Sequence, residues 1–296
     1  MTSLITHLVG LLGPASLWRS GPVHLALLVA TPVALISGAV GVFVVWRGQS
    51  FLGHALSDMG ATGASGASFF GVSAFIGYLT TGFLAGTAVD LWSERVRERD
   101  LATGISLAAA MGLAALFLYL LTTEQGRAGV VQTVLFGSAF AVSPSVVPSV
   151  IILAAATALG LLVLSRPLLF ITLTPEVAQA RGVAVRLVGY LFTLAVVVSV
   201  EEAALVVGAL MSTALLIGPA AAAIRWARRP GIAVILASLL GCASVWVGVI
   251  LAYDSFAWPP AGRGWPVSFL VAAVVFLVYV ASVLSGRRPT ARKVAA

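Results

Sequence analysis

The stretch that decides the fold is His24–Trp46, which reads HLALLVATPVALISGAVGVFVVW. It contains no Asp, Glu, Lys or Arg over 23 consecutive residues. An α-helix needs about 20 apolar residues to cross the hydrocarbon core of a bilayer. The stretch therefore predicts a transmembrane helix, and the rest of the chain repeats the pattern.

Apolar runs of similar length follow along the chain. We expect further spans at Ala61–Val89, Leu101–Leu121, Val150–Leu164, Ile232–Ala252 and Pro266–Leu284. The stretch Gly182–Ile224 is too long for one helix, and its central Glu201-Glu202 predicts two helices that meet at an aqueous turn. The sequence thus predicts an all-α polytopic membrane protein with about eight transmembrane helices.

The segments outside these runs are short. Residues 1–22 carry leucines at helical spacing but no basic n-region, so they predict an N-terminal interfacial helix and not a cleaved signal peptide. The transmembrane domain is expected over residues 23–285, and residues 286–296 form a basic tail that we expect in the cytoplasm. The run Val130–Val142 is too short to cross and predicts a short helix at one membrane face.

The composition of the 296-residue chain also indicates a membrane protein. Hydrophobic residues make up 60% of the chain and charged residues 9%, whereas soluble domains have about 25% charged residues. This excludes a soluble enzyme and a nucleic-acid-binding domain, despite the net charge of +7. The single cysteine, Cys242, excludes an internal disulfide and a cluster of thiolate metal ligands.

The basic residues predict the orientation, because cytoplasmic loops of membrane proteins are enriched in Lys and Arg. With eight spans, both termini lie on the same side of the membrane. All but three of the 17 basic residues then fall on that side, the exceptions being Arg47, Arg127 and Arg263. We therefore expect a multi-pass protein of the cell membrane with both termini in the cytoplasm.

A pair of ionisable residues stands between the first two apolar runs. His54 and Asp58 are four residues apart, which places both on one face of a helix. Ionisable groups near lipid are costly and are kept mainly where they line water, pair with each other or bind ions. An imidazole and a carboxylate together suit divalent ions such as Zn²⁺ or Mn²⁺. The pair is therefore a candidate site on a translocation pathway, or else it only fixes a helix at the outer interface.

The adjacent carboxylates Glu201 and Glu202 allow two interpretations. One is a solvated turn between two helices, and the other is an acidic outer gate that contributes to the passage of a cation.

The chain has no GxxxxGK[ST] motif for binding ATP and no HExxH motif. We therefore do not expect it to be an enzyme, and active transport would draw its energy from a partner chain or from an ion gradient.

Four motifs resemble those of a known family. Residues Gly41–Asp58 read GVFVVWRGQSFLGHALSD and resemble the stretch that follows the first span in zinc/manganese-type ABC transporter permeases. Three more stretches resemble family elements in the same order, at Leu135–Ser138, Thr174–Val183 and Gly208–Ala223. The resemblance covers roughly residues 24–285. It implies a type II-like ABC importer permease.

The resemblance also implies a substrate and partners. The substrate is a divalent metal ion such as Zn²⁺, Mn²⁺ or Fe²⁺, and no cofactor is permanently bound. The partners are a cytoplasmic ATP-binding subunit, an extracytoplasmic metal-binding protein and a second copy of the permease. The segment that docks on the ATPase is matched by Pro175, Glu176, Arg181 and Gly182. The outer gate is matched by Phe136, Gly137 and Ser138.

The chain departs from the family in one respect. The family usually has Asp first and His four residues later, whereas here His54 precedes Asp58.

The sequence is also compatible with two other functions. One is an ABC permease for a metal chelate such as a siderophore or corrinoid, which is usually longer. The other is a secondary transporter driven by an ion gradient, which should show internal repeats that this sequence lacks.

Overall fold

A computed structural model describes residues 20–92, 96–137, 139–258 and 264–285. The predicted interfacial helix at 1–22 lies outside the described residues except for its last three, and the predicted basic tail at 286–296 lies wholly outside them. Every regular element among the described residues is a helix, so the all-α prediction is confirmed.

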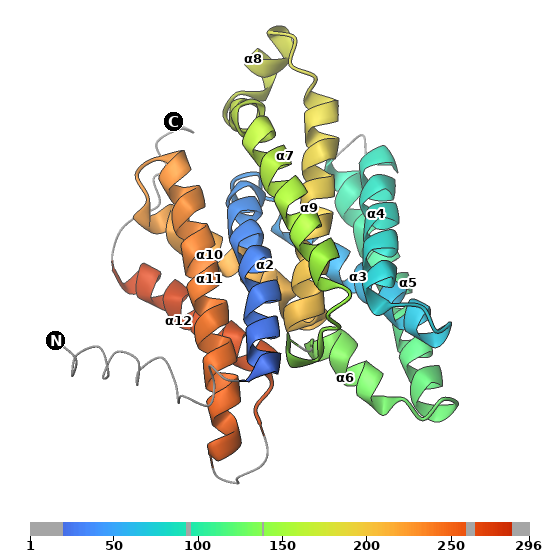
Figure 1. The fold of residues 1–296 in the computed structure, drawn as a ribbon. Helices are drawn as coiled ribbons and strands as arrows, with labels where there is room; N and C mark the ends of the chain where they lie inside the picture. The colour runs from blue at the N-terminus through green and yellow to red at the C-terminus, as the bar shows by residue number, and fades with distance from the viewer. Residues whose placement is uncertain (1–19, 93–95, 138, 259–263, 286–296) are drawn as a thin grey trace, which may run out of the picture.

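The helices follow one another with short connections (Figure 1). They are α2 (Gly21–Trp46), α3 (Ser50–Phe69), α4 (Ala74–Trp92), α5 (Val96–Thr123), α6 (Ala128–Phe136), α7 (Val147–Leu173), α8 (Pro175–Ala180), α9 (Val185–Val207), α10 (Ala209–Trp226), α11 (Pro230–Asp254) and α12 (Val267–Leu284). Two short 3₁₀ turns, η2 (Ala139–Ala141) and η3 (Ser255–Ala257), follow α6 and α11.

Seven helices within the described residues are long and apolar enough to cross a membrane. They lie in α2, α5, α7, α9, α10, α11 with its following 3₁₀ turn, and α12. The prediction of one span over Ala61–Val89 is wrong, because the chain turns between Phe69 and Ala74 and forms α3 and α4 instead. Gly71 allows this turn, since its φ of 76° lies in the left-handed region that favours glycine.

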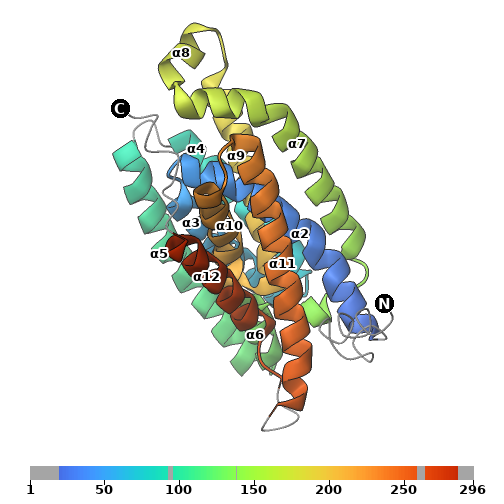
Figure 2. The same cartoon turned by 90° about the vertical axis from the view of Figure 1, so that its left-hand side faces the viewer.

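Helices α2 and α9 form the centre of the bundle. Of the most apolar 18 residues in each, 72% are buried, against 11% in α5 and 22% in α7. Figure 2 shows α5 and α7 on opposite outer sides of the bundle. Their exposed leucines, such as Leu162 in α7, are the surface expected to face lipid.

Small residues let α11 pack closely against α2. A Cβ atom on Gly38 would lie 2.5 Å from the carbonyl oxygen of Ala237, and one on Gly241 would lie 2.9 Å from that of Ala34. Such close backbone contacts are typical of helices that pack within membranes. The Trp246 indole donates a hydrogen bond to the Thr31 hydroxyl at 2.9 Å, one turn further along the same antiparallel contact.

Helix α8 marks one end of the bundle, and the connection between α5 and α6 lies at the other (Figures 1 and 2). The prediction that Arg47 lies on the opposite side from Pro175–Gly182 is wrong. The Arg47 guanidinium lies 5.3 Å from the ring centroid of Phe192. Phe192 belongs to the first half of α9, which is the half nearer to α8. The extra turn between α3 and α4 adds one reversal of the chain, which brings the end of α2 to the α8 end.

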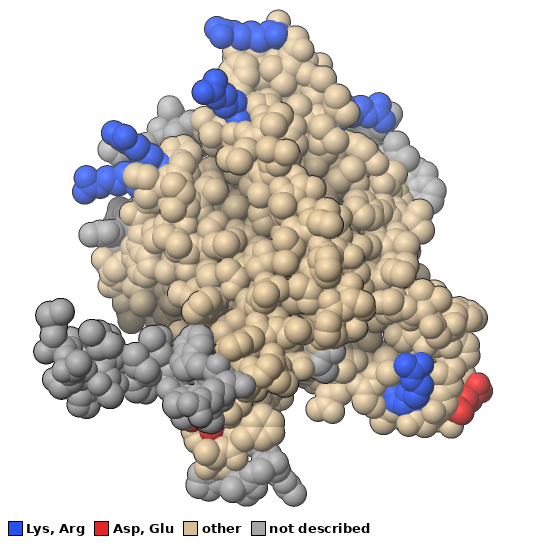
Figure 3. All heavy atoms as spheres, in the orientation of Figure 1, with Lys and Arg blue, Asp and Glu red and all other residues tan. Residues whose placement is uncertain are grey.

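The charges are divided between these two ends. Figure 3 shows most of the visible basic side chains towards the α8 end of the molecule. The acidic side chains visible in the same view lie towards the opposite end. Arg47 therefore lies at the basic end, which its charges predict to be cytoplasmic.

Candidate functional site

The predicted pair on α3 forms as the spacing indicates. His54 Nε2 lies 3.5 Å from Asp58 Oδ2, one helical turn along α3. The His54 side chain is 47% exposed, whereas that of Asp58 is 9% exposed. The imidazole is thus accessible from outside the bundle, whereas the carboxylate is almost enclosed.

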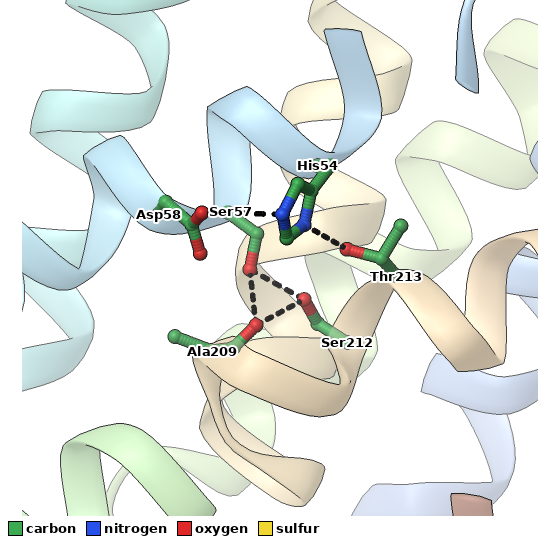
Figure 4. A network of polar contacts seen from close by, with 6 residues as sticks. All are labelled: His54, Ser57, Asp58, Ala209, Ser212 and Thr213. Atoms are coloured by element: carbon green, nitrogen blue, oxygen red, sulfur yellow. Dashed lines mark hydrogen bonds and ion pairs between the residues drawn. The ribbon is translucent and has the colours of Figure 1, made fainter. Parts of the chain in front are cut away.

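Helix α10 holds this part of α3 through hydroxyl groups (Figure 4). The Ser57 hydroxyl donates to the carbonyl oxygen of Ala209 at 2.8 Å and also contacts the Ser212 hydroxyl. The Thr213 hydroxyl lies 3.3 Å from Nδ1 of His54. The sequence does not predict these contacts between α3 and α10, because 152 or more residues separate the partners along the chain.

The geometry of the pair suits one divalent ion bound by two ligand atoms, the imidazole nitrogen and the carboxylate oxygen. Zn²⁺ binds nitrogen and oxygen ligands at about 2.1 Å, so two donors on a tetrahedral ion are about 3.4 Å apart. The distance between His54 Nε2 and Asp58 Oδ2 is close to this value. Within the described ranges, no three His, Cys, Asp or Glu side chains come together as a metal-binding group. Two ligand atoms are fewer than the four that a tetrahedral Zn²⁺ site uses.

The prediction of an aqueous turn at Glu201-Glu202 is wrong. Both residues lie within α9, and both are 0% exposed. The helix continues to Val207 and ends at Gly208, whose φ of 91° lies in the left-handed region. The apolar residues around the two carboxylates support a continuous buried helix, and the glycine supplies the break that the charges were expected to mark.

Glu201 fits between two glycines. A Cβ atom on Gly60 of α3 would collide with Glu201 Oε2, and one on Gly82 of α4 would lie 2.5 Å from Oε1. The carboxylate therefore packs directly on the backbone of both helices. Within the part of the chain that the structure describes, neither Glu201 nor Glu202 has a hydrogen-bond partner for its carboxylate oxygens. The structure does not combine these residues with His54 and Asp58 into one metal-binding group.

The predicted gate residues lie at the end opposite α8 (Figure 1). Gly137 ends α6 with a φ of 72°, and its backbone packs on that of Gly208. A Cβ atom on Gly137 would collide with the Gly208 nitrogen, and one on Gly208 would collide with the carbonyl carbon of Phe136. Phe136 is 40% exposed, and Ser138 lies outside the described residues.

Helix α8 stands out from the bundle at the other end (Figure 2). Pro175 occupies its first turn, where the missing N–H costs nothing, and Glu176 complements the positive end of the helix dipole. Gly182, with a φ of 79°, follows the helix and lets Val183 N donate to the carbonyl oxygen of Ala178. Ala178 is fully buried, which anchors the short helix, while Arg181 is exposed.

Comparison with known proteins places this arrangement in a family. The family model described as "ABC 3 transport family" matches residues 22–283. The chain belongs to the ABC 3 transport family. Its relatives in this family include the manganese transport system membrane protein MntC of Halalkalibacterium halodurans, which is 32% identical over 77% of this chain and 78% of the relative.

Two further comparisons agree with the ABC 3 assignment. The high-affinity zinc uptake system membrane protein ZnuB of Haemophilus influenzae is 29% identical, over 79% of this chain and 90% of that protein. The solved structure "PsaBC from Streptococcus pneumoniae in complex with Fab" has a TM-score of 0.75 and 25% identity, and the match covers 90% of this chain and 92% of that one.

Proposed function

We propose that this member of the ABC 3 transport family is the permease subunit of an ABC importer for divalent metal ions. The observation that carries the proposal is the His54–Asp58 pair. Its two donor atoms face each other at 3.5 Å on a helix that α10 holds in place. The relatives named for manganese and zinc transport support the substrate class, Mn²⁺ or Zn²⁺.

The pair binds the ion transiently during its passage through the membrane. An imidazole nitrogen and a carboxylate oxygen replace part of the hydration shell, and the missing ligands let the ion leave again. Glu201 and Glu202 belong to the proposed pathway because their carboxyl groups are buried among apolar residues, and costly groups of this kind in membrane helices usually mark the route of an ion.

The partners follow from the two ends of the bundle. A cytoplasmic ATP-binding subunit docks on Pro175–Gly182, including Glu176 and Arg181, and supplies the energy by hydrolysing ATP. An extracytoplasmic metal-binding protein delivers the ion at the opposite end, where Phe136, Gly137 and Ser138 form the outer gate. Two copies of this chain assemble around the pathway in the cell membrane.

Asp58→Ala tests the proposal, with uptake of radioactive manganese and zinc by cells as the measurement. The variant removes the enclosed ligand and leaves a lone imidazole, so we expect uptake to fall at least about ten-fold. Glu124→Ala is the matched control, because Glu124 is an exposed carboxylate on the α5–α6 connection. Unchanged uptake of both ions by the Asp58 variant, at normal membrane abundance, would contradict the proposed function.

A further inference from the structure

We propose that Thr213 positions the metal ligand His54, an inference that rests on the proposed function. The Thr213 hydroxyl accepts the N–H of His54 Nδ1. This leaves the lone pair of Nε2 directed towards Asp58 as the metal-binding atom. Neither the family motif nor the spacing of the ligands assigns a role to this residue.

The partners around the imidazole distinguish its two nitrogens. A neutral imidazole has one nitrogen that donates and one that accepts. Nδ1 lies 3.3 Å from the Thr213 hydroxyl, and Nε2 lies 3.5 Å from Asp58 Oδ2. Both distances are slightly longer than the usual 2.7–3.2 Å range of an N–H···O hydrogen bond, so length alone does not distinguish them. The second distance matches the spacing of two ligand atoms on one metal ion, which would take the lone pair of Nε2. The proton therefore belongs on Nδ1.

The part of α10 that carries Thr213 is held against α3 by the residues before it. Ala209 accepts hydrogen bonds from Ser57 at 2.8 Å and from Ser212 at 3.1 Å. These hydrogen bonds hold α3 against the first turn of α10, which begins at Ala209. Ser212 directly precedes Thr213 in that turn. The packing of the two helices thus keeps Thr213 next to His54 (Figure 4).

This support is needed because His54 is half-exposed. With 47% of its side chain accessible, packing alone does not hold the ring in one orientation. Metal-binding histidines generally use the second ring nitrogen to bond an oxygen that fixes the proton and the ring orientation. Removing such a partner typically costs ten- to a hundred-fold in metal affinity or activity.

The test compares Thr213→Val, which keeps the shape and loses the hydroxyl, with Thr213→Ser, which keeps the hydroxyl. Uptake by the complete transporter in cells is measured against the concentration of manganese or zinc. We expect T213V to raise the half-saturating concentration by about ten-fold or more, with a smaller change in the maximal rate. T213S is expected to stay within about two-fold of wild type. Thr172→Val is the control, because the Thr172 hydroxyl donates a hydrogen bond within its own helix α7, to the carbonyl oxygen of Leu168.

A double-mutant cycle separates positioning from structure. If Thr213 acts through the imidazole, T213V has no further effect when His54 is already alanine. An equal loss in both backgrounds, or wild-type half-saturation by T213V, would overturn the inference. Should T213V fail to accumulate in the membrane, Thr213→Ala takes its place with the same expected shift. Failure of the proposed function is recognised separately, because Asp58→Ala tests the ligand pair itself.

Discussion

At the scale of the residue, the molecule places carboxylates in two different settings. Asp58 pairs with an accessible imidazole, whereas Glu201 is enclosed by Gly60 and Gly82 and has no hydrogen-bond partner within the described residues. The first setting is local in sequence, so the spacing of four residues predicts it. The second depends on three helices that meet in space, and the sequence indicates only that small residues are frequent there.

The enclosure of Glu201 leads to a prediction about packing. Gly82→Ala places a methyl group 2.5 Å from Glu201 Oε1, closer than non-bonded atoms approach. Overpacking of this kind typically costs about 1–3 kcal/mol, so we expect less permease in the membrane and a lower unfolding temperature of the purified protein. Glu201→Ala removes the colliding atoms, and the double variant should regain much of the loss.

Gly112→Ala serves as the control for this experiment, because a Cβ atom there meets no atom within 4 Å. If Gly82→Ala lowers stability equally with and without the Glu201 side chain, then the carboxylate does not occupy the space between α3 and α4.

At the scale of the element, hydropathy locates most helices but misplaces the breaks between them. The run Ala61–Val89 looks continuous because Phe69, Phe70 and Val72 keep the turn around Gly71 apolar. Conversely, Glu201-Glu202 looks like an exposed turn, although the break comes six residues later at Gly208. In both cases a glycine with positive φ ends the helix, and average hydrophobicity does not register backbone conformation.

The short helix α8 can be tested as an element. Replacing both Glu176 and Arg181 by Ala leaves its buried anchor Ala178 and its terminal Gly182 in place, so the helix should still form. If the ATP-binding subunit docks here, we expect metal uptake to fall at least about ten-fold. That subunit should also no longer co-purify, or its ATP hydrolysis should no longer drive uptake.

Arg228 and Arg229 provide the control, because they also lie at the α8 end but in the connection between α10 and α11. Replacing this pair by Ala removes as many charges without touching α8. Wild-type uptake and normal co-purification in the α8 variant would argue against docking at this helix.

At the scale of the whole molecule, the chain has two chemically distinct ends. One carries α8, and the residue that follows α2, Arg47, lies at that end as well. The other carries the α5–α6 connection and the Gly137–Gly208 contact. The sequence predicts the charge asymmetry, but it does not predict which connection lies at which end. A single turn that hydropathy misses moves every connection before it to the opposite side of the membrane.

The arrangement of connections yields the last prediction, which separates the fold from the topology expected from hydropathy. If the α8 end faces the cytoplasm, as its basic residues indicate, then Gln49 follows α2 on the cytoplasmic side and Gln125 lies on the outer side. In a Cys242→Ser background, a membrane-impermeant thiol reagent added to intact cells should label Gln125→Cys and should not label Gln49→Cys. Both positions should react after the membrane is opened, which controls for accessibility. Eight spans with Ala61–Val89 as a single helix would instead expose position 49 to the outside. Labelling of position 49 in intact cells would therefore mean that α3 and α4 do not reverse the chain as the structure shows, and that Arg47 is not part of the cytoplasmic basic end.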